Sequence, residues 1–486
     1  MKKVELFLII GILLGAFIVR LYRFDNPIAD WHSWRQADTS AVSRNFVTKG
    51  FDLLHPRFDD LSNVPSGFDN PQGYRFVEFP IYNAFQALLF RLFGILTLEE
   101  WGRLLTIIGS VVSTLFLYLL AKKHISKTAA FFTAFFYAFI PYNIYYGRVI
   151  LPDPSMVSAV LGGTYFFDKW LEENTKGKAK KSIRKEIFFY IIAFLFIAES
   201  LLFKPYAAFF LLPLVYLSYK SFGLGLVKKW QLWMFFIFSF IPLTLWRFWM
   251  TQYPEGIPVN AWLLNGNGIR FRPAFFRWIV YERIAKLIAG YFGIGLLLIG
   301  LYKTWNVKER GFLLSFLLSS VLYVTIFATG NVQHDYYQIL IMPTVALFLG
   351  VGAAVLLGDS KKIVTVQRIV LILLTFGSFY FGWGIVKDYF NINNRAIVTA
   401  GMAVDKLTPK DAKVIAPYVG DTSFLYHTKR QGWASMEKSL PEMIEMGASY
   451  LVQLNPTEND YKGLGSTYKI VSATKEYILF DLKNKP

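Results

Sequence analysis

Ionisable and aromatic side chains cluster in one short stretch, DWHSWRQADTSAVSRNF, which spans residues 30–46 and follows the first long apolar run. It carries Asp30, Arg35 and Asp38, and Glu78 lies further along the same polar segment. A carboxylate can take a proton from a hydroxyl group, and a guanidinium group can hold a phosphate. The stretch therefore suits group transfer from an anionic lipid. The alternative interpretation is that Asp38 only marks the start of a helix, where the helix dipole also stabilises a carboxylate.

A second polar cluster lies in the segment NIYYGRVILPDPSM, between two apolar runs. Arg148 and Asp153 flank a short apolar turn, and two prolines fix the chain direction just before the next helix begins. We interpret the pair as part of a functional site. The alternative is that Asp153 caps the helix while Arg148 lies at the lipid headgroups.

Two further candidates stand beside long apolar runs. Lys204 lies between LFIAESLLF and PYAAFFLLPL, and an ionisable residue in such a place is a functional candidate that could contact a lipid phosphate. The alternative is that Lys204 snorkels from a helix end. His334, in the segment NVQHDYYQ, either anchors the chain at headgroup level together with Tyr336 and Tyr337 or binds a sugar or phosphate.

The composition indicates a membrane protein. Hydrophobic residues make up 54% of the chain and charged residues 17%, which is more apolar material than a water-soluble core of this length uses. The net charge of +18 is interpreted as Lys and Arg in cytoplasmic loops, not as nucleic-acid binding. The chain has no cysteine, so disulfides and thiolate chemistry are excluded. Its five histidines are scattered, so no cofactor is predicted; a metal is not implied, although two outer carboxylates could hold one.

Apolar runs of membrane-spanning length predict about eleven transmembrane helices. The runs are Val4–Leu21, Gly102–Ala121, Ala129–Tyr146, Met156–Leu171, Ile187–Phe203, Tyr206–Tyr219, Leu232–Met250, Ile284–Tyr302, Phe312–Thr329, Ile339–Leu357 and Ile369–Val386. A further run, Ile81–Leu98, is predicted to be an amphipathic helix at the membrane interface, because only that choice places the Lys-rich connections on the inner side. The polar clusters then share the outer face with the first loop and the C-terminal tail.

The tail from residue 391 to residue 486 contains no long apolar run. AIVTAGMAVDKL and SLPEMIEMGA are typical of helices, the second closed by Gly447, while KVIAPYV, SYLVQLN and YKIVSATKEYILFDL are typical of strands. Alternating helices and strands predict a small α/β domain. We therefore predict a transmembrane domain at residues 1–390 and an extracytoplasmic α/β domain at residues 391–486, which covers the active face or contacts the acceptor.

The order of these motifs resembles the GT-C glycosyltransferases, in particular the bacterial branch that includes protein O-mannosyltransferases and the lipid A aminoarabinose transferase. The segments that carry the resemblance are WRQADTSAVSRNF, EFPIYNAFQALLFRLFG, EEWGRLLTIIGSVVSTLFLYLLAKKH, YYGRVILPDPSM, FKPYAAFFLLPL and QHDYYQILIMP. They cover the chain from its N-terminus to about Phe390, and the tail is less diagnostic.

The resemblance implies an all-α polytopic membrane protein of GT-C type, with interfacial helices in the first outer loop and a small C-terminal α/β soluble domain. It also implies a polyprenyl-phosphate sugar as donor, a protein, lipid or envelope-glycan hydroxyl as acceptor, and inversion at the anomeric carbon in one displacement. The protein is expected to be integral to the cytoplasmic membrane, with its active face and C-terminal domain outside, and to have no nucleic-acid partner.

Carried over to this sequence, the resemblance implies that Asp38 is the general base and that Asp153 helps to shape the site. The residues expected to neutralise the leaving phosphate are Arg35, Arg148 and Lys204. The residues expected to contact the substrates are Glu78, His334 and Tyr337. Relatives often carry an acidic pair where this chain has Arg35 and Gln36. The base is therefore Asp38 or, alternatively, Asp30.

Two other classes of protein are alternatives to this interpretation: a flippase or transporter of lipid-linked sugars, and a non-catalytic envelope scaffold. A transporter of this kind is expected to show charged residues at mid-span and paired broken helices in two halves, and the sequence shows neither repeated halves nor repeated Gly/Pro breaks. The ionisable residues cluster instead at one predicted membrane face, which favours chemistry at that face.

Overall fold

The computed structural model describes residues 3–177, 181–358 and 365–485. These residues fall into two compact units. The helical unit comprises Met1–Tyr22, Leu104–Trp246 and Asn260–Asp388, and the mixed unit comprises Arg23–Arg103, Arg247–Val259 and Tyr389–Pro486. The mixed unit therefore joins the first polar loop to the C-terminal segment. The domain bounds predicted at residues 1–390 and 391–486 stay a prediction, because each range includes positions outside the described residues.

The helical unit is built from apolar helices and short breaks between them. Its elements are α1 (Lys3–Val19), α4 (Leu98–His124, which begins in the mixed unit), α5 (Lys127–Phe139), α6 (Pro141–Tyr146), α7 (Asp153–Asn174), α8 (Ile183–Phe203), η2 (Pro205–Leu211), α9 (Leu212–Phe222), η3 (Gly223–Lys228), α10 (Trp230–Met250, which ends in the mixed unit), α11 (Trp262–Asn265), η5 (Ile269–Phe271), α12 (Pro273–Phe276), η6 (Arg277–Ile288), α13 (Gly293–Lys303), η7 (Thr304–Asn306), α14 (Arg310–Ile326), α15 (Ala328–Gln333), η8 (Asp335–Ile341), α16 (Met342–Leu357) and α17 (Thr365–Val386). Each of the eleven predicted apolar runs overlaps at least one of these helices.

Several helices have the length and composition of a membrane span. Among the described residues, six helices are long and apolar enough to cross a membrane. The number becomes seven if Pro273–Ile288 and Gly293–Asn306, bent by 115° at a short break, count as one span. The mostly helical, multi-pass architecture with a small C-terminal sheet is thus confirmed, and the number eleven stays a prediction.

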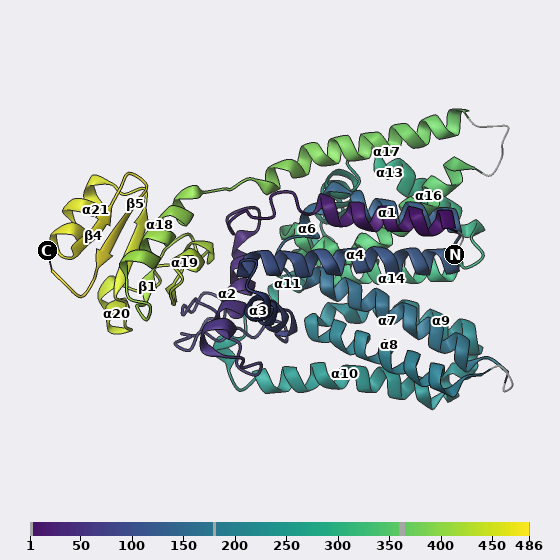
Figure 1. Cartoon of the computed structure of the whole chain (residues 1–486), viewed down its shortest axis with the longest axis horizontal. Coiled ribbons are helices and arrows are strands. Elements are labelled where there is room, and N and C mark those ends of the chain that lie inside the picture. The colour runs from purple at the N-terminus through teal and green to yellow at the C-terminus, as the bar shows by residue number, and fades with distance from the viewer. Residues whose placement is uncertain (1–2, 178–180, 359–364, 486) are drawn as a thin grey trace. The chain divides into compact units, whose positions relative to one another are not determined.

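Small residues allow close helix packing in the helical unit. α7 and α8 lie side by side (Figure 1). α13 and α16 also pack together, and a Cβ atom added to Gly300 would lie 1.9 Å from the carbonyl oxygen of Phe348. A Cβ atom on Gly352 would lie 2.0 Å from that of Leu296. Any larger residue at either glycine would push the two helices apart.

The mixed unit contains a five-stranded sheet and helices from both ends of the chain. Its elements are α2 (Ser33–Lys49), α3 (Ile81–Phe93), η4 (Pro254–Gly256), η9 (Lys387–Phe390, which begins in the helical unit), α18 (Arg395–Leu407), β1 (Val414–Ile415), α19 (Ser423–Thr428), β2 (Gly432–Trp433), α20 (Leu440–Glu445), β3 (Tyr450–Leu454), α21 (Glu458–Lys462), η10 (Leu464–Ser466), β4 (Lys469–Ala473) and β5 (Tyr477–Asp481). The strand order is β2-β1-β3-β5-β4. β1 is parallel to β2 and β3, while β5 is antiparallel to β3 and β4. Figure 1 shows β4 and β5 in yellow, close to the C-terminus.

The predicted elements of the tail agree with the structure. AIVTAGMAVDKL forms α18 and SLPEMIEMGA forms α20, followed by Gly447 with a left-handed φ of 103°. The predicted strands are β1, β3, β4 and β5. The sequence patterns did not predict α19, β2 and α21, which are six, two and five residues long.

The first loop and the C-terminal segment share one hydrophobic core. Ala29 packs in a buried cluster with residues of α18 and β1, and Leu61 packs in a second cluster with Trp433 of β2. The first loop also extends the sheet, because Asp60 forms a parallel β-bridge with Gly432 at the β2 edge. The C-terminal segment is therefore built into the mixed unit and is not a free appendage.

The run Ile81–Leu98 divides into α3 and the first residue of α4. α3 has 13 residues, so it is about 20 Å long and too short to cross a hydrocarbon core of about 30 Å. Its buried face carries Asn83 and Gln86, while Phe85 and Leu92 are exposed. A helix with polar residues inside and apolar residues outside fits the predicted position at a membrane interface.

Candidate active site

Asp38 lies in the second turn of α2, a polar helix most of whose residues are buried. Its side chain is 4% exposed. Arg75 Nη2 donates to Asp38 Oδ2 at 2.6 Å, and Thr422 Oγ1 donates to Asp38 Oδ1 at 2.7 Å. Two segments distant in sequence, one in the first loop and one in the C-terminal segment, therefore fix this carboxylate. Each carboxylate oxygen can accept a second hydrogen bond, so a substrate hydroxyl group could still bind it.

Asp30, the alternative base, precedes α2 and is fully buried. Its Oδ1 accepts a hydrogen bond from Gln36 Nε2 at 2.7 Å, and its backbone carbonyl accepts one from Asn393 at 3.2 Å. These contacts connect the start of α2 to the chain just before α18. They give Asp30 a clear structural role in the mixed unit.

Arg35 and Glu78 form an ion pair in the same unit. The side chains are 6% and 13% exposed, so the pair is largely screened from water. A donor phosphate that bound Arg35 would have to compete with the Glu78 carboxylate. Separate roles were predicted for these two residues, and the structure brings them together.

Two further carboxylates, those of Asp60 and Asp421, interact electrostatically with Asp38. Asp60 is 2% exposed, and burial raises its pKa to about 6, against the opposing hydrogen bonds from Ser62. Burial also raises the pKa of Asp421, and the negative charge of Asp38 adds to that shift. The surroundings of Asp38 are thus acidic, and Arg75 is the cation that contacts it.

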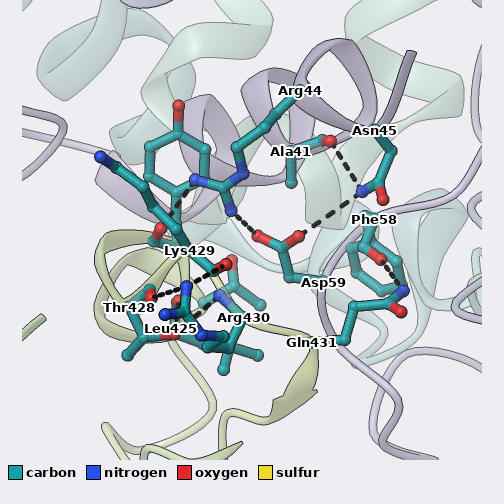
Figure 2. Close-up of polar contacts among 12 residues, drawn as sticks. Ala41, Arg44, Asn45, Phe58, Asp59, Leu425, Thr428, Lys429, Arg430 and Gln431 are labelled. Carbon is teal, nitrogen blue, oxygen red and sulfur yellow. Dashed lines mark hydrogen bonds and ion pairs between the residues drawn. The ribbon is translucent and has the colours of Figure 1, made fainter. Parts of the chain in front are cut away.

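A network at the end of α2 ties the first loop to the C-terminal segment (Figure 2). Arg44 forms an ion pair with Asp59 and donates to the carbonyl oxygen of Tyr426 at 2.9 Å. Gln431 donates to the carbonyl oxygen of Phe58 at 3.2 Å. Burial raises the pKa of Asp59, while the Arg44 charge opposes that shift. These contacts keep α2 at a fixed position in the mixed unit.

The second group of candidates lies in the helical unit. Lys204 Nζ forms a 2.8 Å ion pair with Asp153 Oδ1, and the two side chains are 8% and 2% exposed. Lys204 has an extended backbone between α8 and η2, as expected for a residue that precedes a proline. Asp153 is the first residue of α7. The break at Lys204 and the start of α7 therefore create one buried charged pair.

Aromatic rings surround this pair. Lys204 Nζ lies 5.6 Å from the ring centroid of Tyr336 and 5.9 Å from that of Tyr337. The His334 ring stacks on Tyr337 at 6.1 Å and contacts Trp262. Electron-rich ring faces attract an ammonium group, so the rings help to hold Lys204 in place.

Arg148 is fully buried in the turn between α6 and α7. Its guanidinium carbon lies 5.5 Å from the ring centroid of Tyr145. Nearby, Tyr142 donates from its hydroxyl group to the carbonyl oxygen of Asp335 at 2.7 Å. The turn that carries Arg148 and the turn that carries His334 therefore belong to one packed region.

The candidate residues are thus divided between the two units. Asp30, Arg35, Asp38 and Glu78 lie in the mixed unit, and Arg148, Asp153, Lys204, His334 and Tyr337 lie in the helical unit. Arg75 and Thr422 were not predicted from the sequence. A cation in a loop rich in carboxylates was a weak signal for Arg75, whereas nothing in the sequence connects Thr422 to a residue 384 positions away. Among the described residues, no group of three or more His, Asp or Glu side chains is placed to hold a metal ion.

These features define a class of protein. The family model described as dolichyl-phosphate-mannose-protein mannosyltransferase matches residues 77–246, and the fold is that of the GT-C glycosyltransferases, as the structural comparisons below show. The chain is therefore a multi-pass membrane protein with a glycosyltransferase fold, and the resemblance seen in the sequence is confirmed. A sequence comparison with curated proteins finds no significant match.

Three solved structures illustrate the likeness. ArnT from Cupriavidus metallidurans bound to undecaprenyl phosphate is 12% identical with a TM-score of 0.63, over 99% of this chain and 98% of ArnT. The Archaeoglobus fulgidus oligosaccharyltransferase in the apo form is 11% identical with a TM-score of 0.62, over 93% of this chain and 70% of that one. The mycobacterial arabinofuranosyltransferase AftD is 14% identical with a TM-score of 0.54, over 97% of this chain and 41% of AftD.

Proposed function

We propose that this protein transfers a sugar from a polyprenyl-phosphate donor to an acceptor hydroxyl group, with Asp38 as the general base. The observation that carries the proposal is the environment of Asp38, a buried carboxylate of the first loop that is held at 2.6 Å by Arg75 of the same loop and at 2.7 Å by Thr422 of the C-terminal segment. A carboxylate fixed in this way can take a proton in a defined direction. Asp30 is the alternative base.

The proposed reaction is a single displacement. The acceptor oxygen forms a bond to the anomeric carbon, and the bond from that carbon to the phosphate oxygen breaks with its electron pair. The acceptor proton passes to the base, and the configuration at the anomeric carbon inverts. Because the leaving polyprenyl phosphate gains one negative charge, the reaction requires nearby cations more than it requires a nucleotide or a metal.

Lys204 and Arg148 are the cations proposed to receive the leaving phosphate. Lys204 is buried, paired with Asp153 and flanked by tyrosine rings, an arrangement that holds an ammonium group ready for a second anionic partner. Arg148 is fully buried in the neighbouring turn. Arg35 is the third candidate for this role, and like Lys204 it is paired with a carboxylate, that of Glu78.

The substrates and the location belong to the same proposal. The structure of ArnT with undecaprenyl phosphate supports a polyprenyl-phosphate donor by likeness of fold. We propose that Glu78, His334 and Tyr337 contact the sugar or the acceptor, which is a protein, a lipid or an envelope glycan. The positive-inside pattern supports a position in the cytoplasmic membrane with the reaction at the outer face.

The test is release of free polyprenyl phosphate by the purified protein in lipid, supplied with a set of polyprenyl-phosphate sugars and an acceptor extract. We expect release with one donor and transfer of its sugar to the extract. A matched reaction without acceptor is the control. Movement of an intact lipid-linked sugar between leaflets without release would support the transporter alternative, and neither release nor movement with any donor would support the scaffold.

A further inference from the structure

The loop between β1 and α19 brings the C-terminal segment to Asp38. Thr422 is the last residue of this loop, and its hydroxyl oxygen lies 2.7 Å from Asp38 Oδ1 and 3.2 Å from the carbonyl oxygen of Trp34. Both acceptors belong to α2. Thr422 is thus a residue of the C-terminal segment that touches the proposed base directly.

We propose that Thr422 is a positioning residue for Asp38, so that the C-terminal segment completes the active site. This inference rests on the proposed function, because it assigns Thr422 a role only through the base. Arg75 holds one carboxylate oxygen and Thr422 holds the other. With both oxygens fixed, the plane of the carboxylate is set and the remaining lone pairs point in constant directions.

Because two acceptors lie near Thr422, its hydroxyl group can form a hydrogen bond with Asp38 both when Asp38 is ionised and when it is protonated. A threonine hydroxyl group has one proton to donate and can also accept. While Asp38 is ionised, the proton is best placed toward Oδ1, since a hydrogen bond to a charged acceptor is the stronger one. Once Asp38 has taken the acceptor's proton, the hydroxyl group can turn toward the Trp34 carbonyl and accept from Asp38.

Several other contacts hold the residues that flank Thr422. Asp421 Oδ1 accepts from the backbone N–H of Ser423 at 2.8 Å, and Ser33 at the start of α2 contacts the same carboxylate at 3.5 Å. α19, which follows Thr422, packs on α2. The contact to Asp38 is therefore part of a built interface inside the mixed unit and does not depend on a mobile side chain.

Substitutions at Thr422 can distinguish a positioning role of its hydroxyl group from a structural role of the whole side chain. Thr422→Val keeps the shape of the side chain and removes the hydroxyl group, whereas Thr422→Ser keeps the hydroxyl group. Thr408→Val is a matched control, because Thr408 is a buried threonine of the same segment that donates only to the Val404 carbonyl at 2.8 Å. Each variant is measured as full-length protein in lipid, with the polyprenyl-phosphate release assay.

We expect Thr422→Val to lower kcat by roughly 10- to 100-fold, the range that corresponds to loss of a hydrogen bond to a charged group. The KM for the donor should stay within about twofold, because Thr422 does not contact the donor in this account. The acidic limb of the pH–rate profile should move to higher pH, since the ionised base loses a donor. The other charged neighbours, Arg75, Asp60 and Asp421, are unchanged in the variant.

Three outcomes of these measurements decide whether Thr422 positions the base. The inference stands if Thr422→Val shows the kcat loss and the shifted acidic limb while Thr422→Ser and Thr408→Val behave like the native chain. It is overturned, with the proposed function intact, if Asp38→Asn abolishes release and Thr422→Val does not lower kcat. If Asp38→Asn leaves release unchanged, the base assignment fails, and the role of Thr422 fails with it.

Discussion

The backbone of Asp60 pairs with the backbone of Gly432 in a parallel β-bridge. Leu61 N–H donates to the Gly432 carbonyl at 2.7 Å, and Gly432 N–H donates to the Asp59 carbonyl at 2.9 Å. The first loop thus adds a short strand to the edge of the C-terminal sheet. α2, which carries Asp38, belongs to the same loop. The pairing at the sheet edge therefore also helps to position the proposed base.

Gly432 is a sensitive position because it also lies very close to β1. A Cβ atom on Gly432 would lie 1.8 Å from the Val414 carbonyl oxygen, so Gly432→Ala must force β1 and β2 apart. We expect a loss of about 1–3 kcal/mol in the free energy of unfolding, typical of overpacking. Hydrogen–deuterium exchange should also show faster exchange at residues 58–61. Gly384→Ala is the control, since a Cβ atom there meets nothing within 4 Å; native-like exchange in Gly432→Ala would contradict the pairing.

Asp60 should make stability depend on pH. Its folded pKa is raised from 3.8 to about 6 by burial, so ionisation costs the folded state more than the unfolded state. Its contribution is fully present below about pH 4 and is lost as the pH rises through about 6. The total change is roughly 3 kcal/mol.

Thermal unfolding of the native chain and of Asp60→Asn between pH 4.5 and pH 7.5, in one detergent, measures this contribution. The native chain should lose stability relative to Asp60→Asn as the pH rises. Parallel pH curves for the two proteins would show that Asp60 ionises normally in the folded state.

The Lys204–Asp153 pair offers a test of the donor site. Lys204→Met leaves the buried Asp153 carboxylate without its ammonium partner, and we expect a loss of about 3–5 kcal/mol in the free energy of unfolding. The double variant Lys204→Met with Asp153→Asn should recover most of that stability. It should not recover polyprenyl-phosphate release, because the phosphate still lacks its cation.

The control for this pair is Lys308→Met, at an exposed lysine, which should change neither quantity. Native-like release by the stable double variant would remove Lys204 from the donor site and leave it a purely structural residue.

Val419 carries backbone strain in the loop that leads to Thr422. Its φ is 53° and its side chain is fully exposed, although a β-branched residue rarely adopts a left-handed conformation. Val419→Asn should therefore stabilise the fold by about 1 kcal/mol. Chemical unfolding can measure this, with Val259→Asn as a control at an exposed valine whose φ is not positive. A destabilised Val419→Asn would mean that the valine side chain makes a contact that outweighs the strain.

Much of the fold could be predicted from sequence because its signals are local. The long apolar runs, the α3 pattern and the strand-forming segments of the tail each express a preference of neighbouring residues. The breaks were predictable for the same reason: a proline follows Lys204, and a left-handed Gly447 follows α20.

The site was less predictable because its contacts are between distant segments. The sequence marked Asp38 by its unusual surroundings, but its two partners came from the other end of the first loop and from the C-terminal segment. Arg35 was expected to meet a phosphate, yet it pairs with Glu78. Which charges meet is decided by the packing of the mixed unit, and a single sequence carries no signal for it.

The most direct test of the central claim compares Asp38→Asn with the native chain in the polyprenyl-phosphate release assay. Asp69→Asn serves as the matched control, since Asp69 is an exposed carboxylate of the same loop, and Asp30→Asn tests the alternative base. The account predicts that Asp38→Asn, folded and able to bind donor, loses release by at least about 100-fold, as expected for removal of a general base, while Asp69→Asn stays native-like. Native-like release by Asp38→Asn would contradict the account, and loss in Asp30→Asn alone would transfer the base to Asp30.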